Sequence, residues 1–288
     1  MRIAGFSIVR QGHRFGYPFV ASLRSLLPLV DELVLGVGDG DDGTWETLKA
    51  LKEPKLKLFR SVWDMREREG GKVLSVETNK ALARCKGDWA VYLQADELLH
   101  EDDLPLIRQS MQKNLGLPVG GLSFRYLHFY GSYQTLQDQP RKWYRRAVRA
   151  VRLGRGIESV GDAYGFKGPR GASLTRRDGG ARIFHYGWSR PPGIMAQKQR
   201  NLDSMYHDEA WLERHHPEEA KARADFYGDR GHLKFFHGSH PAPIRALAAS
   251  QDWSFDHQIG RQWPAWLRHL YVTFVYPVRK RLGWRFAS

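Results

Sequence analysis

Residues 89–97 are Trp89-Ala90-Val91-Tyr92-Leu93-Gln94-Ala95-Asp96-Glu97, a continuous apolar run over 89–93 followed by a segment that ends in two carboxylates. Such a run is typical of a strand buried on both faces, as in parallel sheets covered by helices. Ligands of these sheets bind beyond the carboxyl ends of the strands. The position of Asp96 and Glu97 therefore indicates a site, although two acids in front of a helix are also explained as an N-terminal cap.

The chain before this run alternates in the same way. Apolar segments predict strands over 2–9, 32–37 and 55–62, and helical spacing predicts helices over 17–29, 44–52 and 71–86, with Thr44 as an N-cap. This order predicts an α/β fold with a mostly parallel sheet flanked by helices. Polar residues also follow the first two strands, from Arg10 onward and in the loop Asp39–Asp42. Each cluster alone is explained as a turn, but together at successive strand ends they favour a site.

The charge of the 288 residues is uneven. Lys and Arg balance Asp and Glu up to residue 120, so the whole net charge of +14 lies beyond it. A basic surface attracts nucleic acid, anionic lipid and phosphorylated substrates alike, so charge alone names no partner. The single cysteine, Cys85, excludes a disulfide framework and a zinc site of several thiolates.

The chain shows neither a signal peptide nor an apolar run long enough for a membrane span, so a cytoplasmic location is expected. We expect one α/β domain over 1–190, divided into halves at 120, and a helical, basic region over 191–288. Aromatic-rich strands are predicted over 121–130 and 142–151. A later strand ends at Ile183-Phe184-His185-Tyr186-Gly187-Trp188.

Several segments together resemble family 2-type glycosyltransferases of the GT-A fold, over about the first two-thirds of the chain. They are Val9-Arg10, Asp31-Glu32, Gly38 to Thr44, Thr78 to Leu82, Gly87-Asp88-Trp89 and Tyr92 to Glu97. The resemblance implies an enzyme that transfers a sugar from a nucleotide-sugar to a hydroxyl of a glycan or glycolipid acceptor. It further implies an inverting transfer, in the synthesis of a surface polysaccharide or lipopolysaccharide-type molecule.

The resemblance also implies a site. The Asp-x-Asp motif of the family matches Gln94-Ala95-Asp96, which leaves Asp96 to hold Mg²⁺ or Mn²⁺ with His185 as a further ligand. Hard cations of this kind take oxygen ligands and stabilise a leaving diphosphate. Asp162, or Glu158 as the second choice, is expected to take the proton of the acceptor. The expected nucleotide-sugar contacts are Val9, Arg10, Asp39, Asp41, Asp42, Asn79, Gln94, Asp96, Arg145 and Arg149.

Simpler interpretations stand beside these. His185 would be a packed histidine, Asp162 a loop carboxylate paired with an arginine, and Arg145 and Arg149 part of a solvated basic face. Trp263 to Leu282 repeats apolar residues at helical spacing among basic ones, which favours a helix lying on an anionic membrane, with capping of the core as the alternative. The competing function is a catalytically inactive GT-A domain that serves as a membrane-associated scaffold. Nucleic-acid binding fits worst, because no base-reading motif is present.

Overall fold

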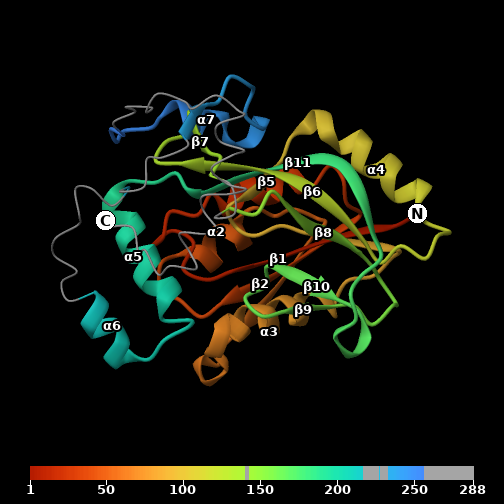
Figure 1. Ribbon diagram of the computed structural model, residues 1–288, viewed down its shortest axis with the longest axis horizontal. Coiled ribbons are helices and arrows are strands. Elements are labelled where there is room, and N and C mark those ends of the chain that lie inside the picture. Colours follow the sequence, from red (N-terminus) through yellow and green to blue (C-terminus); the bar gives the residue numbers. More distant parts are fainter. Residues whose placement is uncertain (140–142, 217–226, 228–232, 256–288) are drawn as a thin grey trace, which may run out of the picture.

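The computed structural model describes residues 1–139, 143–216, 227 and 233–255, and places a ten-stranded sheet at the centre of the molecule (Figure 1). Its strand order is β12-β7-β6-β8-β4-β1-β2-β3, and β11 pairs with β6 and β5 beside this path. The strands are β1 (Ile3–Val9), β2 (Glu32–Gly38), β3 (Leu56–Ser61), β4 (Trp89–Tyr92), β5 (Glu97–Leu99), β6 (Gly121–Tyr130), β7 (Thr135–Gln137), β8 (Arg146–Arg152), β11 (Arg176–Trp188) and β12 (Leu233–Phe235). A separate two-stranded sheet contains β9 (Glu158–Val160) and β10 (Gly165–Lys167).

Helices cover both faces of the sheet. They are α1 (Phe19–Leu26), α2 (Thr44–Ala50), α3 (Lys72–Leu82), α4 (Leu104–Lys113), α5 (Pro192–Asp203), α6 (Glu209–His215) and α7 (Arg245–Ala249). In Figure 1, the N-terminus lies at one side of the molecule, and α5 and α6 lie at the opposite side.

The first half confirms the expected pattern, because β3, β2, β1 and β4 are all parallel neighbours. Every residue of β1 is buried. Its side chains point alternately to the two faces of the sheet and pack in two hydrophobic clusters. Ile3 and Val9 pack in one cluster with Leu23 of α1, and Phe6 packs in the other with Val73 of α3. Each such side chain, once fully buried, contributes about 1.5–3 kcal/mol. The continuous apolar runs in the sequence follow from this burial on both faces.

Two local predictions are corrected, and a third is not tested. The cap of α2 is Gly43, at φ 80°, and Thr44 is the first helical residue. The Thr44 hydroxyl instead accepts a 2.8 Å hydrogen bond from the amide of Gly12. Glu97 opens a short strand and no helix, which removes the capping interpretation. The helix expected near the C-terminus lies outside the described residues.

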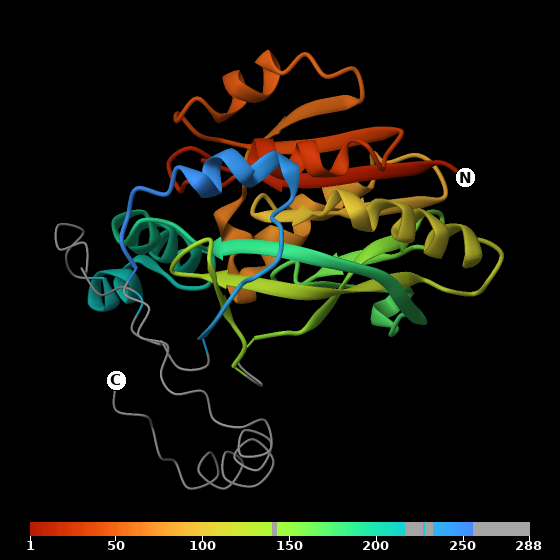
Figure 2. The ribbon, with the colours of Figure 1, turned by 90° about the horizontal axis from the view of Figure 1, so that it is seen from above.

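The second half adds antiparallel and mixed pairing. β8 runs antiparallel to both β4 and β6, and β11 lies parallel to β6 along most of its length, as the curved strand in Figure 2. Only the last part of β11 was predicted. Described segments beyond residue 190 contact the sheet, because β12 pairs with β7 and Ile244 packs with Phe129 and Tyr186. Within the described ranges, no helix has the length and apolarity needed to cross a membrane.

Candidate active site

The carboxylate of Asp96 is buried just beyond the carboxyl end of β4. The next residue begins β5, which pairs antiparallel with β11 and places Glu97 opposite His185. The carbonyl oxygen of Asp96 accepts a 2.8 Å hydrogen bond from the amide of Tyr186. This pairing brings Nε2 of His185 to 3.8 Å from Oδ1 of Asp96. The two expected metal ligands are therefore neighbours in the structure.

Hydrogen bonds determine which nitrogen of His185 carries the proton. Nε2 of His128 lies 2.7 Å from the carbonyl oxygen of Tyr144 and must donate to it. A neutral imidazole has one N–H, so Nδ1 of His128 accepts from Nδ1 of His185, 2.9 Å away. Burial lowers the pKa of His128 to about 3 and that of His185 to about 4, which keeps both rings neutral at pH 7. Nε2 of His185 is consequently an unprotonated nitrogen beside Asp96.

Two basic side chains face the other oxygen of Asp96. Nζ of Lys198, from α5, lies 3.0 Å from Oδ2, and Nη2 of Arg190 lies 3.7 Å from the same atom. Burial acts to raise the pKa of Asp96, but its basic neighbours, with Lys198 first among them, together outweigh burial and hold that pKa well below the usual range. Burial also lowers the pKa of Lys198 to about 8, although Asp96 opposes that shift. The carboxylate is thus ionised at neutral pH.

The donor set fits a divalent cation. Oδ1 of Asp96 and Nε2 of His185 both present lone pairs. A carboxylate is a suitable ligand for Mg²⁺ and Mn²⁺, whereas an imidazole nitrogen is more usual on a transition metal such as Mn²⁺. Gly187 keeps the space beside them open, since a Cβ there would lie 2.4 Å from Nε2 of His185 and 3.2 Å from Oδ2 of Asp96. Within the described ranges, no three His, Cys, Asp or Glu side chains gather around one point. The protein would supply two ligands and a phosphate or water the others.

Gln94 occupies the place of the first acid of the motif. Its backbone is held on both sides, because the amide donates to Oε2 of Glu97 at 3.1 Å and the carbonyl oxygen accepts from the hydroxyl of Ser22 at 3.1 Å. The turn between β4 and β5 is therefore fixed by main-chain contacts. A contact of Gln94 with a nucleotide-sugar stays a prediction.

A second group of expected residues meets where β1 and β2 end. The Arg10 guanidinium, which follows buried Val9, donates to the carboxylate of Asp39 at 3.0 Å. That carboxylate also accepts from the amide of Trp63 at 3.0 Å. Burial acts to raise the pKa of Asp39, but these hydrogen bonds lower it overall. Trp63, which the sequence did not single out, thus belongs to this part of the edge.

Asp41, Asp42 and Asn79 have other partners. Asp41 forms a 2.8 Å ion pair with Arg14, and Asp42 accepts from the backbone amide of Arg14 at 2.9 Å. These contacts hold the segment after β1 against the loop after β2. Asn79, on α3, both donates to and accepts from the backbone of Ser159, at 2.9 and 2.7 Å. Asn79 therefore joins α3 to β9, and its role toward a nucleotide stays a prediction.

The two arginines expected to clamp phosphate differ. Arg145 is exposed. Arg149 is fully buried and bonds the Glu97 carboxylate with two nitrogens, at 2.8 and 2.9 Å. The hydroxyl of Tyr126 donates to the same carboxylate at 2.7 Å. The structure corrects our expectation for Arg149. Its guanidinium is paired with the carboxylate of Glu97 and is buried, so it has no exposed atom that could bind a phosphate.

The two candidate bases lie on and beside the small β9–β10 sheet. Glu158 is exposed at the start of β9. Asp162 follows β9, and its carboxylate accepts from the Tyr206 hydroxyl at 3.0 Å and the Tyr164 amide at 3.1 Å. The carbonyl oxygen of Tyr164 in turn accepts from Arg149 at 2.8 Å. This chain of contacts links the loop of Asp162 to Glu97, the neighbour of Asp96.

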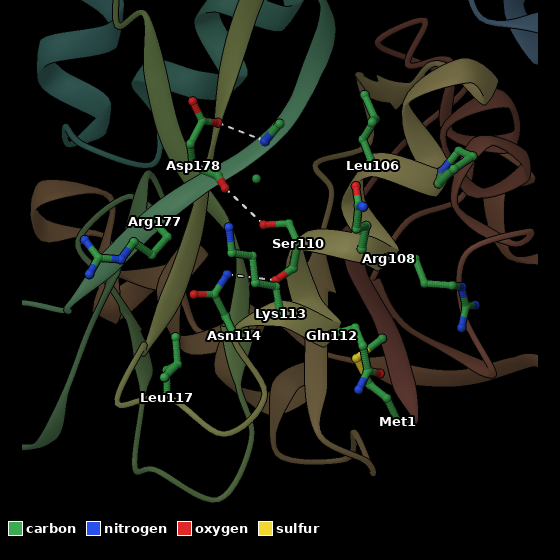
Figure 3. A pocket seen from close by; sticks show the side chains of 14 residues that line it. Met1, Leu106, Arg108, Ser110, Gln112, Lys113, Asn114, Leu117, Arg177 and Asp178 are labelled. Atoms are coloured by element: carbon green, nitrogen blue, oxygen red, sulfur yellow. Dashed lines mark hydrogen bonds between the residues drawn. The ribbon is translucent and has the colours of Figure 1, made fainter.

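Sequence reasoning missed His128, Arg190 and Lys198. Their partners are distant in sequence, and only the pairing of β6, β11 and β5 and the position of α5 bring them together. A cavity of about 1390 Å³ lies elsewhere, between α4 and the first residues of β11 (Figure 3). Ser110, Asn114 and Asp178 line it, at the end of β11 remote from His185. It is thus distinct from the Asp96 site.

An acid, an imidazole and two cations thus meet beyond the carboxyl end of β4 in a mixed α/β sheet. The chain belongs to glycosyl transferase family 2, whose sequence model matches residues 17–168, more than half of its length. His185, Arg190 and Lys198 lie beyond the matched segment. No curated protein matches the chain.

Solved structures of TarS from S. aureus are similar to the chain at low identity. One has 13% identity and a TM-score of 0.40, and the match covers 78% of this chain and 44% of that chain. TarS 1–349 in complex with UDP-GlcNAc has 13% identity and a TM-score of 0.38, with 80% of this chain and 75% of that chain covered. The complex of TarS 1–349 with UDP has 13% identity and a TM-score of 0.37, with 77% and 74% covered. The chain thus spans less than half of the longer TarS chain.

Proposed function

We propose that this protein transfers a hexose-type sugar from a nucleotide-sugar to a hydroxyl of a glycan or glycolipid acceptor, with inversion at the anomeric carbon. The observation that carries the proposal is the pair formed by Oδ1 of Asp96 and the unprotonated Nε2 of His185, 3.8 Å apart. Asp96 and His185 would hold Mg²⁺ or Mn²⁺, which supplies Lewis-acid stabilisation of the leaving diphosphate when bound. Arg10 and Asp39 would contact the nucleoside.

Asp162 is our candidate for the general base. In the transfer, the acceptor oxygen forms a bond to the anomeric carbon while the bond from that carbon to the diphosphate oxygen breaks. The electron pair leaves with the diphosphate, and the hydroxyl proton passes to the Asp162 carboxylate. The hydroxyl of Tyr206 supports this role, because burial raises its pKa and it stays a donor that orients Asp162. Glu158 is the alternative base.

The acceptor is proposed to be a surface polysaccharide or lipopolysaccharide-type molecule reached at the inner face of a membrane. The support is the aromatic and basic composition of residues 263–285, which suits an anionic lipid surface. Those residues lie outside the described ones. Co-sedimentation of the full chain with phosphatidylglycerol vesicles, compared with phosphatidylcholine vesicles, tests this part separately.

Donor consumption tests the proposed activity. UDP-, GDP- and dTDP-sugars are incubated with wild type, Asp96→Asn, Asp162→Asn and Glu158→Gln, with Mn²⁺ present and water as the acceptor of the sugar, and release of nucleoside diphosphate is measured. We expect one donor class to be consumed, Asp96→Asn to be inactive and Asp162→Asn to be slower by a factor of about 10²–10⁴. Full activity of Asp162→Asn with loss in Glu158→Gln would move the base to Glu158. Binding without turnover by wild type would favour the inactive scaffold.

A further inference from the structure

Lys198 is a buried cation whose partners lie within the proposed site. Only 11% of its side chain is exposed. Its ammonium donates to Oδ2 of Asp96 at 3.0 Å and to the carbonyl oxygen of Gly187 at 2.7 Å. Lys198 stands one helical turn after Met195, which is buried among Tyr130, Tyr227 and Phe255. Since residues three apart share a face of a helix, the anchoring of Met195 holds Lys198 toward Asp96.

Arg190 supplies a second cation with an unused donor. Its Nη1 donates to the carbonyl oxygens of Tyr186 and Gly187, and its Nε donates to that of Gly16. Nη2 is buried, has no hydrogen-bond partner and lies 3.7 Å from Oδ2 of Asp96. A buried guanidinium nitrogen without an acceptor is costly in free energy, so its presence beside a proposed phosphate site points to a ligand.

The charges around Asp96 also favour an anion. One carboxylate faces both a lysine and an arginine, and both cations lie 4.9 Å from the ring of Tyr17. The cluster therefore carries one more positive than negative charge in a buried place, which a diphosphate would neutralise.

We propose that Lys198 and Nη2 of Arg190 bind the diphosphate of the donor, beside the Asp96–His185 pair. This inference rests on the proposed function and extends it, because it gives the chain a diphosphate site that works in part without metal. As the sugar leaves, negative charge grows on the diphosphate, and two fixed cations in a water-poor site stabilise that charge. Lys198 also keeps the carboxylate of Asp96 oriented, with Oδ2 engaged and Oδ1 toward His185.

Binding in EDTA tests the proposal by calorimetry. UDP, GDP and dTDP are titrated, together with the nucleoside of whichever diphosphate binds. We expect Lys198→Gln to weaken diphosphate binding by at least about tenfold, the usual effect of one charge-assisted hydrogen bond, without changing nucleoside binding. Lys198→Arg should stay within a few-fold of wild type. Lys113→Gln, an exposed lysine on α4, is the matched control.

Asp96→Asn should change diphosphate affinity in the opposite direction from Lys198→Gln. Without metal, removal of the carboxylate frees Lys198 and removes repulsion, so this variant should bind the diphosphate more tightly than wild type in EDTA. It also tests the proposal if Lys198→Gln fails to fold. Unchanged diphosphate affinity in Lys198→Gln, or weaker binding in Asp96→Asn, would overturn the role of Lys198. Failure of wild type to bind any of the diphosphates, with or without Mn²⁺, would overturn the proposed function as well.

Discussion

Nδ1 of His185 lies 2.9 Å from Nδ1 of His128, and this contact settles the chemistry of the opposite nitrogen of His185. His128 is itself fixed by the carbonyl oxygen of Tyr144, so a hydrogen-bonded chain leads from the backbone to the unprotonated Nε2 of His185. Outer partners of this kind orient metal-binding histidines and set their tautomer. His128 is thus a positioning residue for the proposed metal site.

Replacement of His128 should weaken metal binding although no ligand is removed. In His128→Phe, His185 loses the acceptor for Nδ1–H, and Mn²⁺ affinity in the presence of nucleoside diphosphate should fall by about 10–100-fold. Electron paramagnetic resonance of free Mn²⁺ measures this affinity, and ¹⁵N shifts of His185 report its tautomer. An unchanged tautomer and affinity would contradict the hydrogen-bonded chain.

Gly187 should not tolerate a methyl group. In Gly187→Ala the new Cβ would meet Nε2 of His185 at 2.4 Å, a contact that forces the ring or the loop to move. We expect metal-dependent nucleotide binding to be lost and the melting temperature to fall. Gly116→Ala, where a Cβ meets nothing within 4 Å, is the control and should resemble wild type. Normal binding by Gly187→Ala would show that the site has more room than the structure gives it.

The buried pair of Arg149 and Glu97 should matter for stability. Arg149→Met leaves the Glu97 carboxylate buried without its cation, which costs about 3–5 kcal/mol of unfolding free energy. Urea denaturation measures this loss, and the double variant Glu97→Gln/Arg149→Met should recover much of it. The exposed pair of Arg66 with Asp64 provides the comparison, since solvent screens it and Arg66→Met should leave the unfolding free energy nearly unchanged. Equal losses in both arginine variants would refute the buried-pair account.

His240 should make the free energy of unfolding fall at acidic pH. Its Nδ1 lies 2.8 Å from the hydroxyl of Tyr186, and burial, with the nearby charges of Arg245 and His100, lowers its pKa to about 4. The unfolded chain binds the proton at the ordinary pKa of about 6.5, so stability is lost as the pH falls from about 6.5 toward 4. Because the ring is only half-buried, the expected loss is roughly 1 kcal/mol. His240→Gln should flatten this part of the pH profile in urea denaturation, and an unaltered slope would assign it to other groups.

The sequence predicted the parts of the fold that depend on neighbours in the chain. The apolar runs of β1, β2 and β4 and the acids that follow them were recognised because burial on both faces leaves a local pattern. Asp96 and His185 were singled out through a family motif and a strand end, and the structure places the two side chains next to each other.

Contacts between distant segments left no such pattern. Arg149 could not be distinguished from a phosphate ligand, because its partner Glu97 is supplied by another strand of the sheet. Lys198 was placed in a separate C-terminal region, yet α5 returns to the carboxyl end of β4 and delivers it to Asp96. Thr44 is a residue type that often caps a helix, but its hydroxyl accepts a hydrogen bond from the amide of Gly12, in the segment after β1.

Calorimetric titration of UDP, GDP and dTDP, each with and without Mn²⁺, into wild type and Asp96→Asn tests the central claim most directly. Binding of ligand to the folded state also raises thermal stability, which gives an independent readout. The account predicts that Mn²⁺ strengthens the binding of one diphosphate to wild type and has no such effect on Asp96→Asn. An equal effect of Mn²⁺ on both proteins would contradict the assignment of Asp96 as the centre of the site.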